Sequence, residues 1–451
     1  MNDRRRFRSG RPLLCLSIAA GLAAGAPARA QQAAPADTLT LRHAVELALE
    51  RAPQLAATRA SRDEASAAAE ISHDALHPSV WVSTTPGYSS GLPVSVAGSV
   101  PAYASIEVRQ TIYDPWRKTE ALQAEASAAD FEGAVESGCA DTVRTTATAY
   151  AKAWTDERRA DAASRGLAAA EAARDRAIAL FREGRMTGID VDRAKLAAAR
   201  AKQKLLNAES DRDLDGIDLK RLIGWPASAP LRLSSESDAA LAEVDSAENL
   251  AAARAADPQL KALGRQIELL GRSAQISSKR WPVIAASAQY QRLPEYYSKY
   301  YNSFNENNFS VGVSIRVPVW AGGLLDDTEA KAKASVTRAE AELRVRESDL
   351  EMAVRRAEAA VAKSEAESSL ARRARGIAGQ EVAAAELLLT EGRAEAGELD
   401  ARRLALADAD EEAATTSLHA LEDRLKLLAL RGDLSKTILG AEPACSVVAV
   451  R

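Results

Sequence analysis

The sequence predicts a mostly helical protein in which very long α-helices are combined with two pairs of β-strands. Proline is absent from residues 116–225 and from residues 319–442, although the chain carries 16 prolines. Proline breaks helices because it removes a backbone donor and clashes with the preceding turn. Both stretches are also rich in Ala, Glu, Arg and Leu, which favour helix. One helix over residues 116–182 would be about 100 Å long, far longer than the helices of ordinary globular domains.

The first thirty residues have the features of a secretory signal peptide. A cluster of arginines precedes the apolar run Leu13–Ala24, and Ala28-Arg29-Ala30 supplies the small residues at which signal peptidase cuts. We therefore expect a signal peptide at residues 1–30. Cys15 lacks the small residue that normally precedes a lipidated cysteine, so the sequence does not predict a lipid anchor.

The charge of the mature chain excludes nucleic acid as a partner. Loss of the signal peptide reduces 59 basic and 63 acidic residues to 53 and 62, which leaves a net charge of −9. Binding to phosphates needs clustered cationic side chains. After residue 30 no apolar run approaches the roughly 20 residues of a transmembrane helix, so any membrane entry would have to use β-strands.

The chain contains two similar halves. Ala52-Pro53-Gln54-Leu55 recurs 205 residues later as Asp257-Pro258-Gln259-Leu260, and Glu183-Gly184-Arg185 recurs 208 residues later as Glu391-Gly392-Arg393. Such repetition indicates one structural plan used twice. The expected division is a first repeat at residues 31–223, a linker at 224–246, a second repeat at 247–434 and a C-terminal tail at 435–451.

Each half is predicted to contain helix, two strands, a long helix, a glycine turn and a further helix. In the first half a short helix at residues 40–50 is followed by a helix that Pro53 opens and that ends before Pro78. Strands are expected at Val80–Thr85 and Tyr103–Tyr113, separated by a loop rich in Pro, Gly and Ser.

The strands of the second half are expected at Val283–Gln291 and Phe309–Val319, and the last one alternates most clearly. Its apolar face holds Val311, Val313, Ile315, Val317 and Val319, and its other face holds Gly312, Ser314, Arg316 and Pro318. The alternation fits either a sheet packed on a core or membrane strands with one lipid-facing side. Four strands cannot close a barrel, and open edges in lipid are costly, so membrane strands would require several chains.

Apolar residues at steps of three and four form seams along the predicted helices. The seams are Val191, Ala194, Ala198, Ala201, Leu205 and Ala208, and Leu406, Ala409, Ala413, Thr416 and Ala420. This is coiled-coil spacing. The small seam residues suit the curved wall of a helical tube, although an ordinary long coiled coil fits almost as well.

With these features the chain resembles the TolC-like outer membrane efflux proteins, the exit ducts of Gram-negative multidrug pumps and type I secretion systems. The resemblance covers residues 39–434 and is most specific in Phe181–Leu196 and Leu389–Leu404. It includes the strand exit Val317–Gly323 and the helix ending Leu219–Gly224. The first half departs from the strand-exit motif, since Thr111-Ile112-Tyr113-Asp114-Pro115 stands in its place.

The resemblance implies a mixed α/β membrane protein that forms a homotrimer. Four strands from each chain would contribute to a trimeric, 12-stranded outer membrane β-barrel, continued by a periplasmic α-helical tube. The implied function is the outer membrane channel of a tripartite efflux or type I secretion system. Implied partners are a periplasmic adaptor protein, an inner membrane RND or ABC transporter and outer membrane lipid, with no cofactor.

Several site residues follow from the resemblance. The tips farthest from the membrane, where an adaptor would dock, are Gly184, Arg185, Gly188, Gly392 and Arg393. A periplasmic gate of acidic side chains matches Glu398 best, with Asp190 as its first-half counterpart and Asp400 as a neighbour. Capping of helix N-termini is the equally weighted alternative for these carboxylates.

The strand pattern and the cysteines give further expectations. Val311, Val313, Ile315 and Val317 should face lipid, while Ser314 and Arg316 should face the lumen. Cys139 and Cys445 are expected near the middle of the tube in an oxidising compartment, where we suggest that they form a disulfide.

No enzyme motif is found in the sequence. His73 and His77 have a spacing at which helical histidines can share a metal, but no third ligand is nearby, so ordinary polar residues near a helix end are favoured. Gly322-Gly323 lacks the pattern of a phosphate loop. Two function classes remain, a transport duct and a periplasmic coiled-coil scaffold or spacer, and the alternating strands favour the duct. The exported substrate is not specified.

Overall fold

The computed structural model describes residues 38–85, 102–234, 249–279, 281–292, 306–319, 321–393 and 395–440. Contacts divide the chain after Asp37, and the unit that begins at Thr38 contains all of these residues. The predicted signal peptide and Cys445 lie outside them.

The first half of the chain folds in the predicted order. Its elements are α1 (Leu41–Arg51), α2 (Pro53–Asp74), β1 (Ser79–Thr85), β2 (Ala102–Tyr113), α3 (Pro115–Arg182) and α4 (Gly188–Leu222). Pro53 opens α2, as expected for a residue with no backbone donor in the first helical turn. The 68 residues of α3 form one continuous helix, about 100 Å long, which confirms the prediction from the missing prolines.

The second half repeats this order. Its elements are α5 (Asn249–Ala256), α6 (Pro258–Ser277), β3 (Val283–Arg292), β4 (Asn307–Arg316), α7 (Leu324–Thr390) and α8 (Ala396–Arg431), followed by the short α9 (Leu434–Leu439). Asp257 caps α6 by accepting the Gln259 N–H at 2.8 Å, and its second oxygen accepts from Arg346 of α7 at 2.7 Å. The cap therefore also joins two helices.

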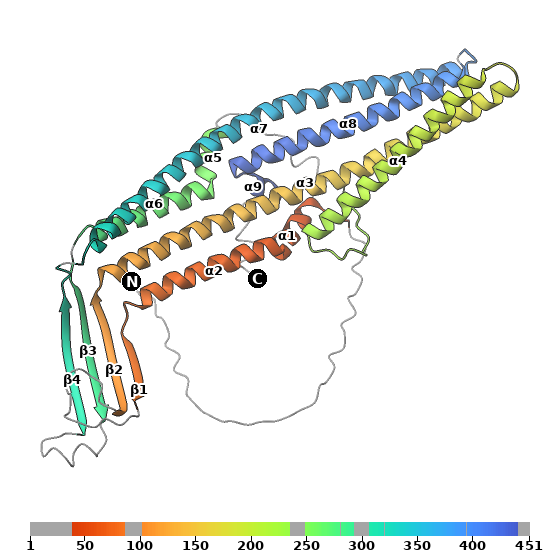
Figure 1. The fold of residues 1–451 in the computed structure, drawn as a ribbon. Helices are drawn as coiled ribbons and strands as arrows, with labels where there is room; N and C mark the ends of the chain where they lie inside the picture. The colour runs from red at the N-terminus through yellow and green to blue at the C-terminus, as the bar shows by residue number, and fades with distance from the viewer. Residues whose placement is uncertain are drawn as a thin grey trace, which may run out of the picture. The chain divides into compact units, whose positions relative to one another are not determined.

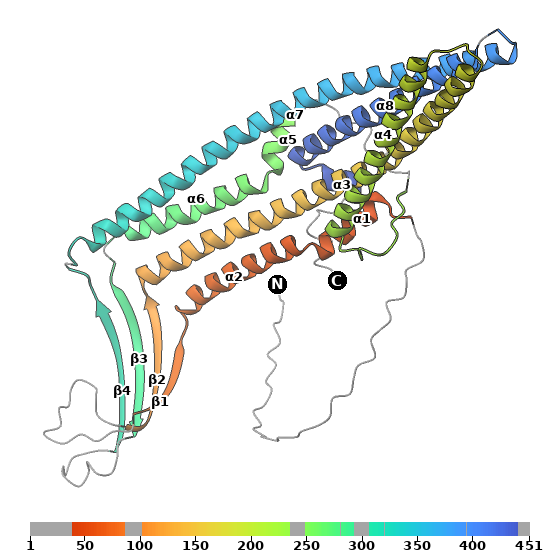
Figure 2. The same ribbon diagram turned by 45° about the vertical axis from the view of Figure 1, so that its right-hand side comes forward.

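The four strands form one antiparallel sheet in the order β1-β2-β3-β4. Figures 1 and 2 both show the sheet at one end of α2, α3, α6 and α7, and the α3–α4 and α7–α8 turns at the opposite end of the helices. Along its length α3 packs against α2 and α6, and also against α4 and α8. The long helices thus connect the sheet to the two turns.

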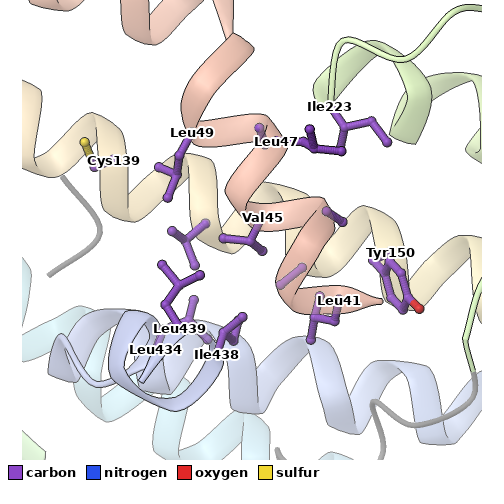
Figure 3. Close-up of a cluster of buried hydrophobic side chains, with 14 of the residues drawn as sticks. Leu41, Val45, Leu47, Leu49, Cys139, Tyr150, Ile223, Leu434, Ile438 and Leu439 are labelled. Carbon is purple, nitrogen blue, oxygen red and sulfur yellow. The ribbon is translucent and has the colours of Figure 1, made fainter. Parts of the chain in front are cut away.

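A hydrophobic cluster holds α1 and α9 against the middle of α3 (Figure 3). Tyr150 of α3, which is 1% exposed, donates its hydroxyl to the Leu39 carbonyl at 2.7 Å and accepts the Ser234 N–H at 3.1 Å. The Leu39 N–H in turn donates to the Arg232 carbonyl at 2.8 Å. The segment that follows α4 is therefore fixed beside the start of α1.

Small residues dominate the contacts between the long helices. Ala160 and Ala163 of α3 cluster with Ala208 of α4, and Leu205 packs beside them, as the predicted seam requires. In α8 the seam residues Ala413 and Ala420 are buried. None of the helices in the described ranges has a window long and apolar enough to cross a membrane.

Candidate functional site

One face of the sheet is apolar across all four strands. The strand register aligns Val80, Val108, Ala288 and Val311 in one row, and Val82, Ile106, Tyr290 and Phe309 in the next. Two further rows align Gln110, Ala286 and Val313, and Tyr113, Ile284 and Ile315. Gln110 is the polar member, and its side-chain amide donates to the Leu76 carbonyl at 2.9 Å.

The opposite face of the sheet is polar. Its rows contain Trp81, Glu107, Gln289 and Ser310, then Ser79, Arg109, Ser287 and Gly312, then Ser83, Ser105, Gln291 and Asn308. Trp81 is the large apolar exception. This division into faces agrees with the predicted alternation of β4, in which Ser314 and Arg316 lie opposite Val313 and Ile315.

The apolar face has no cover within the described part of the chain. Val311, Val313 and Ile315 are 67%, 64% and 67% exposed, and Val80 and Val82 at the other edge are equally open. A contiguous apolar surface of this extent marks a contact with another protein or with a membrane.

The predicted strand at residues 309–319 needs a correction at both ends. β4 begins at Asn307 and ends at Arg316, because Pro318 has no backbone N–H to extend the pairing. Val317 and Val319 are exposed, but they lie one and three residues beyond the end of the strand. Neither belongs to the aligned rows, so the apolar face of β4 consists of Phe309, Val311, Val313 and Ile315.

The two glycine turns have the same backbone structure. Gly184 and Gly392 have φ angles of 72° and 70°, a left-handed conformation that glycine adopts without strain. After α3, the Arg185 N–H donates to the Leu180 carbonyl at 2.9 Å and the Gly184 N–H donates to the Phe181 carbonyl at 3.0 Å. Arg393 and Gly392 make the same pair of bonds to the end of α7. Both helices therefore end in a Schellman motif.

Charged side chains repeat at these turns. Arg185 lies 3.4 Å from Glu183, and Arg393 lies 3.3 Å from Glu391, each pair exposed. Gly188 is the first residue of α4. The turns bring the predicted tip residues of both halves to one end of the helices, away from the sheet (Figure 1).

The three candidate gate carboxylates have different surroundings in the structure. Asp190 forms a capping box with Thr187, whose hydroxyl donates to it at 2.6 Å. The hydrogen bonds from Thr187 lower the pKa of Asp190. Asp190 therefore performs the capping role that the sequence left as the alternative.

Asp400 is buried rather than open to a channel axis. It is 4% exposed and forms an ion pair with Arg176 of α3. This contact between α8 and α3 argues against the predicted place of Asp400 beside a gate. Glu398 remains exposed, and it lies 3.6 Å from Arg402, one turn later on the same helix.

A buried charge cluster between α3, α4 and α8 was not predicted. Asp156 of α3 is 2% exposed and accepts from Arg159 at 2.8 Å. Burial and a hydrogen bond with Asp215 of α4 raise its pKa to about 6, against the opposing influence of Arg159. Arg159 also lies 3.6 Å from Asp211 of α4 and 3.9 Å from Glu411 of α8.

The sequence did contain a sign of this burial. Asp156 precedes Ala160 and Ala163 by four and seven residues, so it falls on the same stripe of α3 that packs against α4. A carboxylate on a small-residue seam must be paired or protonated, because an isolated buried charge is costly.

The two histidines contact different acids. His73 pairs with Glu125 of α3, while His77 lies 3.0 Å from Asp74 on its own helix end. Among the described residues no group of three His, Cys, Asp or Glu side chains is placed to hold a metal ion.

Cys139 lies in the hydrophobic cluster beneath α1 and is disulfide-bonded. Its predicted partner, Cys445, follows the end of α9 and lies outside the described residues, so the pairing stays a prediction. We expect mass spectrometry of unreduced digests to show a peptide that links Cys139 to Cys445. Substitution of Cys445 by Ser should then lower the free energy of unfolding by about 2–4 kcal/mol. Two titratable thiols in the oxidised protein would contradict the pairing.

Comparisons with known proteins agree with this architecture. The family model described as outer membrane efflux protein matches residues 44–225. No sequence among curated proteins matches the chain.

Solved structures share the fold over most of the chain. CusC has 12% sequence identity and a TM-score of 0.73, with 87% of this chain and 92% of that chain covered. VceC of Vibrio cholerae has 18% identity and a TM-score of 0.66, with 87% and 96% covered. CmeC of Campylobacter jejuni, an outer membrane channel, has 11% identity and a TM-score of 0.70, with 91% and 88% covered.

Proposed function

Because the outer membrane efflux protein model matches residues 44–225 and solved outer membrane channels share the fold, we propose that the chain belongs to this family and that three copies of it form a channel through the outer membrane. The channel would carry small molecules or polypeptides out of the cell envelope. Its wall would consist of the sheets in the membrane and of α3, α4, α7 and α8 in the periplasm.

The observation that supports this proposal most strongly is the pair of opposite faces on the sheet. An apolar face that no other described segment covers suits lipid, and the polar face behind it suits a water-filled lumen. A periplasmic spacer, the other class that the helices allow, would expose the same apolar rows to water without benefit.

The edges of the sheet support assembly from several copies. Within the described residues β1 and β4 each pair on one side only. An unpaired edge in lipid leaves backbone groups unsatisfied at several kcal/mol each. Pairing of β4 in one copy with β1 in the next would close a ring of three sheets and remove every edge.

Fractionation of cells tests the proposal. We expect the protein in the outer membrane fraction, as trimers that dissociate on heating in detergent, and we expect these trimers to conduct ions in planar bilayers. Recovery of the protein only in the soluble periplasm would favour the spacer instead.

We further propose that the two glycine turns receive a periplasmic adaptor protein, which would connect the channel to an inner membrane transporter of the RND or ABC class. Both Schellman turns present the same exposed Glu-Gly-Arg sequence at one end of the helices. A repeated surface of this kind would let one adaptor bind both halves of the chain in the same manner.

Glu398 is the remaining candidate for an acidic ring at this end. In planar bilayers, Glu398→Ala should lower the cation-over-anion permeability ratio several-fold, because three exposed carboxylates around an axis attract cations. Asp192→Ala is a matched control, since Asp192 is an exposed carboxylate in the first turns of α4. An equal change in both variants, or none in either, would leave Glu398 without a gating role.

A further inference from the structure

A small cavity lies where the sheet meets the helices. Its volume is about 190 Å³, and it is enclosed by the start of α3, the end of α6 and the first turns of α7. Among its lining side chains are two tryptophans, two lysines and one carboxylate: Trp116, Trp281, Lys279, Lys331 and Glu120.

An aromatic contact joins this cavity to the apolar side of the sheet. The register aligns Tyr113 with Ile284 and Ile315, in the last apolar row before the helices begin. The Tyr113 ring contacts the Trp281 ring edge-on, with centroids 5.9 Å apart. Trp281 and Trp116 are 45% and 39% exposed. Half-exposed aromatic residues at the end of a lipid-facing sheet are typical of the border between membrane and water.

The two lysines are free to bind an anion. The Lys279 ammonium lies 5.9 Å from the Trp281 ring centroid. Among the described residues neither Lys279 nor Lys331 forms an ion pair, whereas Lys333, two residues further along α7, lies 2.6 Å from Glu329. Glu120 supplies an acceptor for hydroxyl groups at the same cavity.

We propose that this cavity binds the head group of an anionic phospholipid. Lys279 and Lys331 would contact the phosphate, Glu120 would accept hydrogen bonds from head-group hydroxyls, and the tryptophans would pack against the glycerol and upper acyl region. The inference rests on the proposed function, since it requires the sheet to lie in a membrane.

Native mass spectrometry of the intact trimer in mixed micelles tests the site, with phosphatidylglycerol as the probe. The double variant Lys279→Gln/Lys331→Gln should bind phosphatidylglycerol about 30-fold more weakly than the wild type, since each of the two cations contributes on the order of 1 kcal/mol near an anionic lipid. The matched control is Lys118→Gln/Lys333→Gln, which removes the same charge from α3 and α7 at residues that do not line the cavity. It should retain wild-type binding, and phosphatidylcholine should bind all three proteins equally weakly.

The outcomes separate this site from the proposed function. One outcome is that trimers form in the outer membrane while the two double variants bind phosphatidylglycerol equally weakly, and another is that both bind it as tightly as the wild type. Either result would overturn the lipid site and leave the proposed channel intact. Displacement of the lipid by millimolar inorganic phosphate would show a simple anion site and would also overturn the lipid assignment. Protein without trimers or membrane association would instead overturn the channel, before any lipid is measured.

Discussion

Val313→Arg should prevent stable trimers from accumulating in the outer membrane, whereas Ser314→Arg should be tolerated. Val313 lies on the apolar face, opposite Ala286, while its neighbour Ser314 lies on the polar face, opposite Ala285. An arginine near the middle of the lipid layer costs about 2–4 kcal/mol in a membrane barrel, and a trimer contains three copies. The yield of heat-dissociable trimers in the membrane fraction measures the effect.

The design includes its own controls. Both substitutions place the same charge on adjacent residues of one strand, so differences in synthesis or export cannot explain a difference in yield. Val313→Leu should assemble normally because it keeps the apolar surface. Equal yields of the two arginine variants would mean that the apolar face does not contact lipid.

The sequence predicted the strands and their faces well because both depend on local patterns. Alternation with a period of two requires no knowledge of distant contacts. The exit of β4 was less well predicted, since the valine pattern continues to Val319 whereas backbone pairing stops at Arg316. The decisive residue is Pro318, which cannot donate a ladder hydrogen bond.

The glycine turns were also predictable from local sequence. Glu-Gly-Arg occurs twice, and in both places the glycine adopts the left-handed conformation that ends a helix. The length of α3 followed from the absence of proline over its span. These features are fixed by residues that lie within one or two turns of each other.

Pairings between distant helices could not be predicted. Arg176 and Asp400 are separated by 224 residues, and nothing in either local sequence indicates that the two meet. Glu398 and its neighbour Asp400 were therefore both candidates for the gate, although the structure buries Asp400 and exposes Glu398. The cavity between α3, α6 and α7 was missed for the same reason, since it depends on three helices.

The contact between α3 and α4 should be stronger at acidic pH, because of Asp156. Its pKa is raised from 3.8 to about 6 by burial and by the hydrogen bond with Asp215, against the influence of Arg159. The folded state therefore holds a proton that the unfolded chain releases above about pH 4. This contribution to stability is fully present below about pH 4 and declines as the pH rises through about 6.

The neighbouring charges limit how the cluster can respond. Arg159 faces Asp156, Asp211 and Glu411, and Lys204 of α4 pairs with Glu411 and, at 2.9 Å, with Asp408. Two cations, Arg159 and Lys204, thus lie among four carboxylates besides that of Asp215. Once Asp156 is ionised, it repels Asp215, and the α3–α4 contact weakens.

Comparison of Asp156→Asn with the wild type isolates this effect. Asparagine is neutral at every pH and can donate to Asp215, so the Tm of the variant should exceed that of the wild type by more at pH 7.5 than at pH 5, and the two should converge below about pH 4. Asp175→Asn, which alters an exposed carboxylate paired with Arg174 on the same helix, should show no such divergence between the two pH values. A Tm difference between Asp156→Asn and the wild type that stays constant from pH 5 to pH 7.5 would show that Asp156 does not titrate in this range. Divergence confined to Asp156→Asn would identify the buried carboxyl pair as the pH-sensitive contact between α3 and α4.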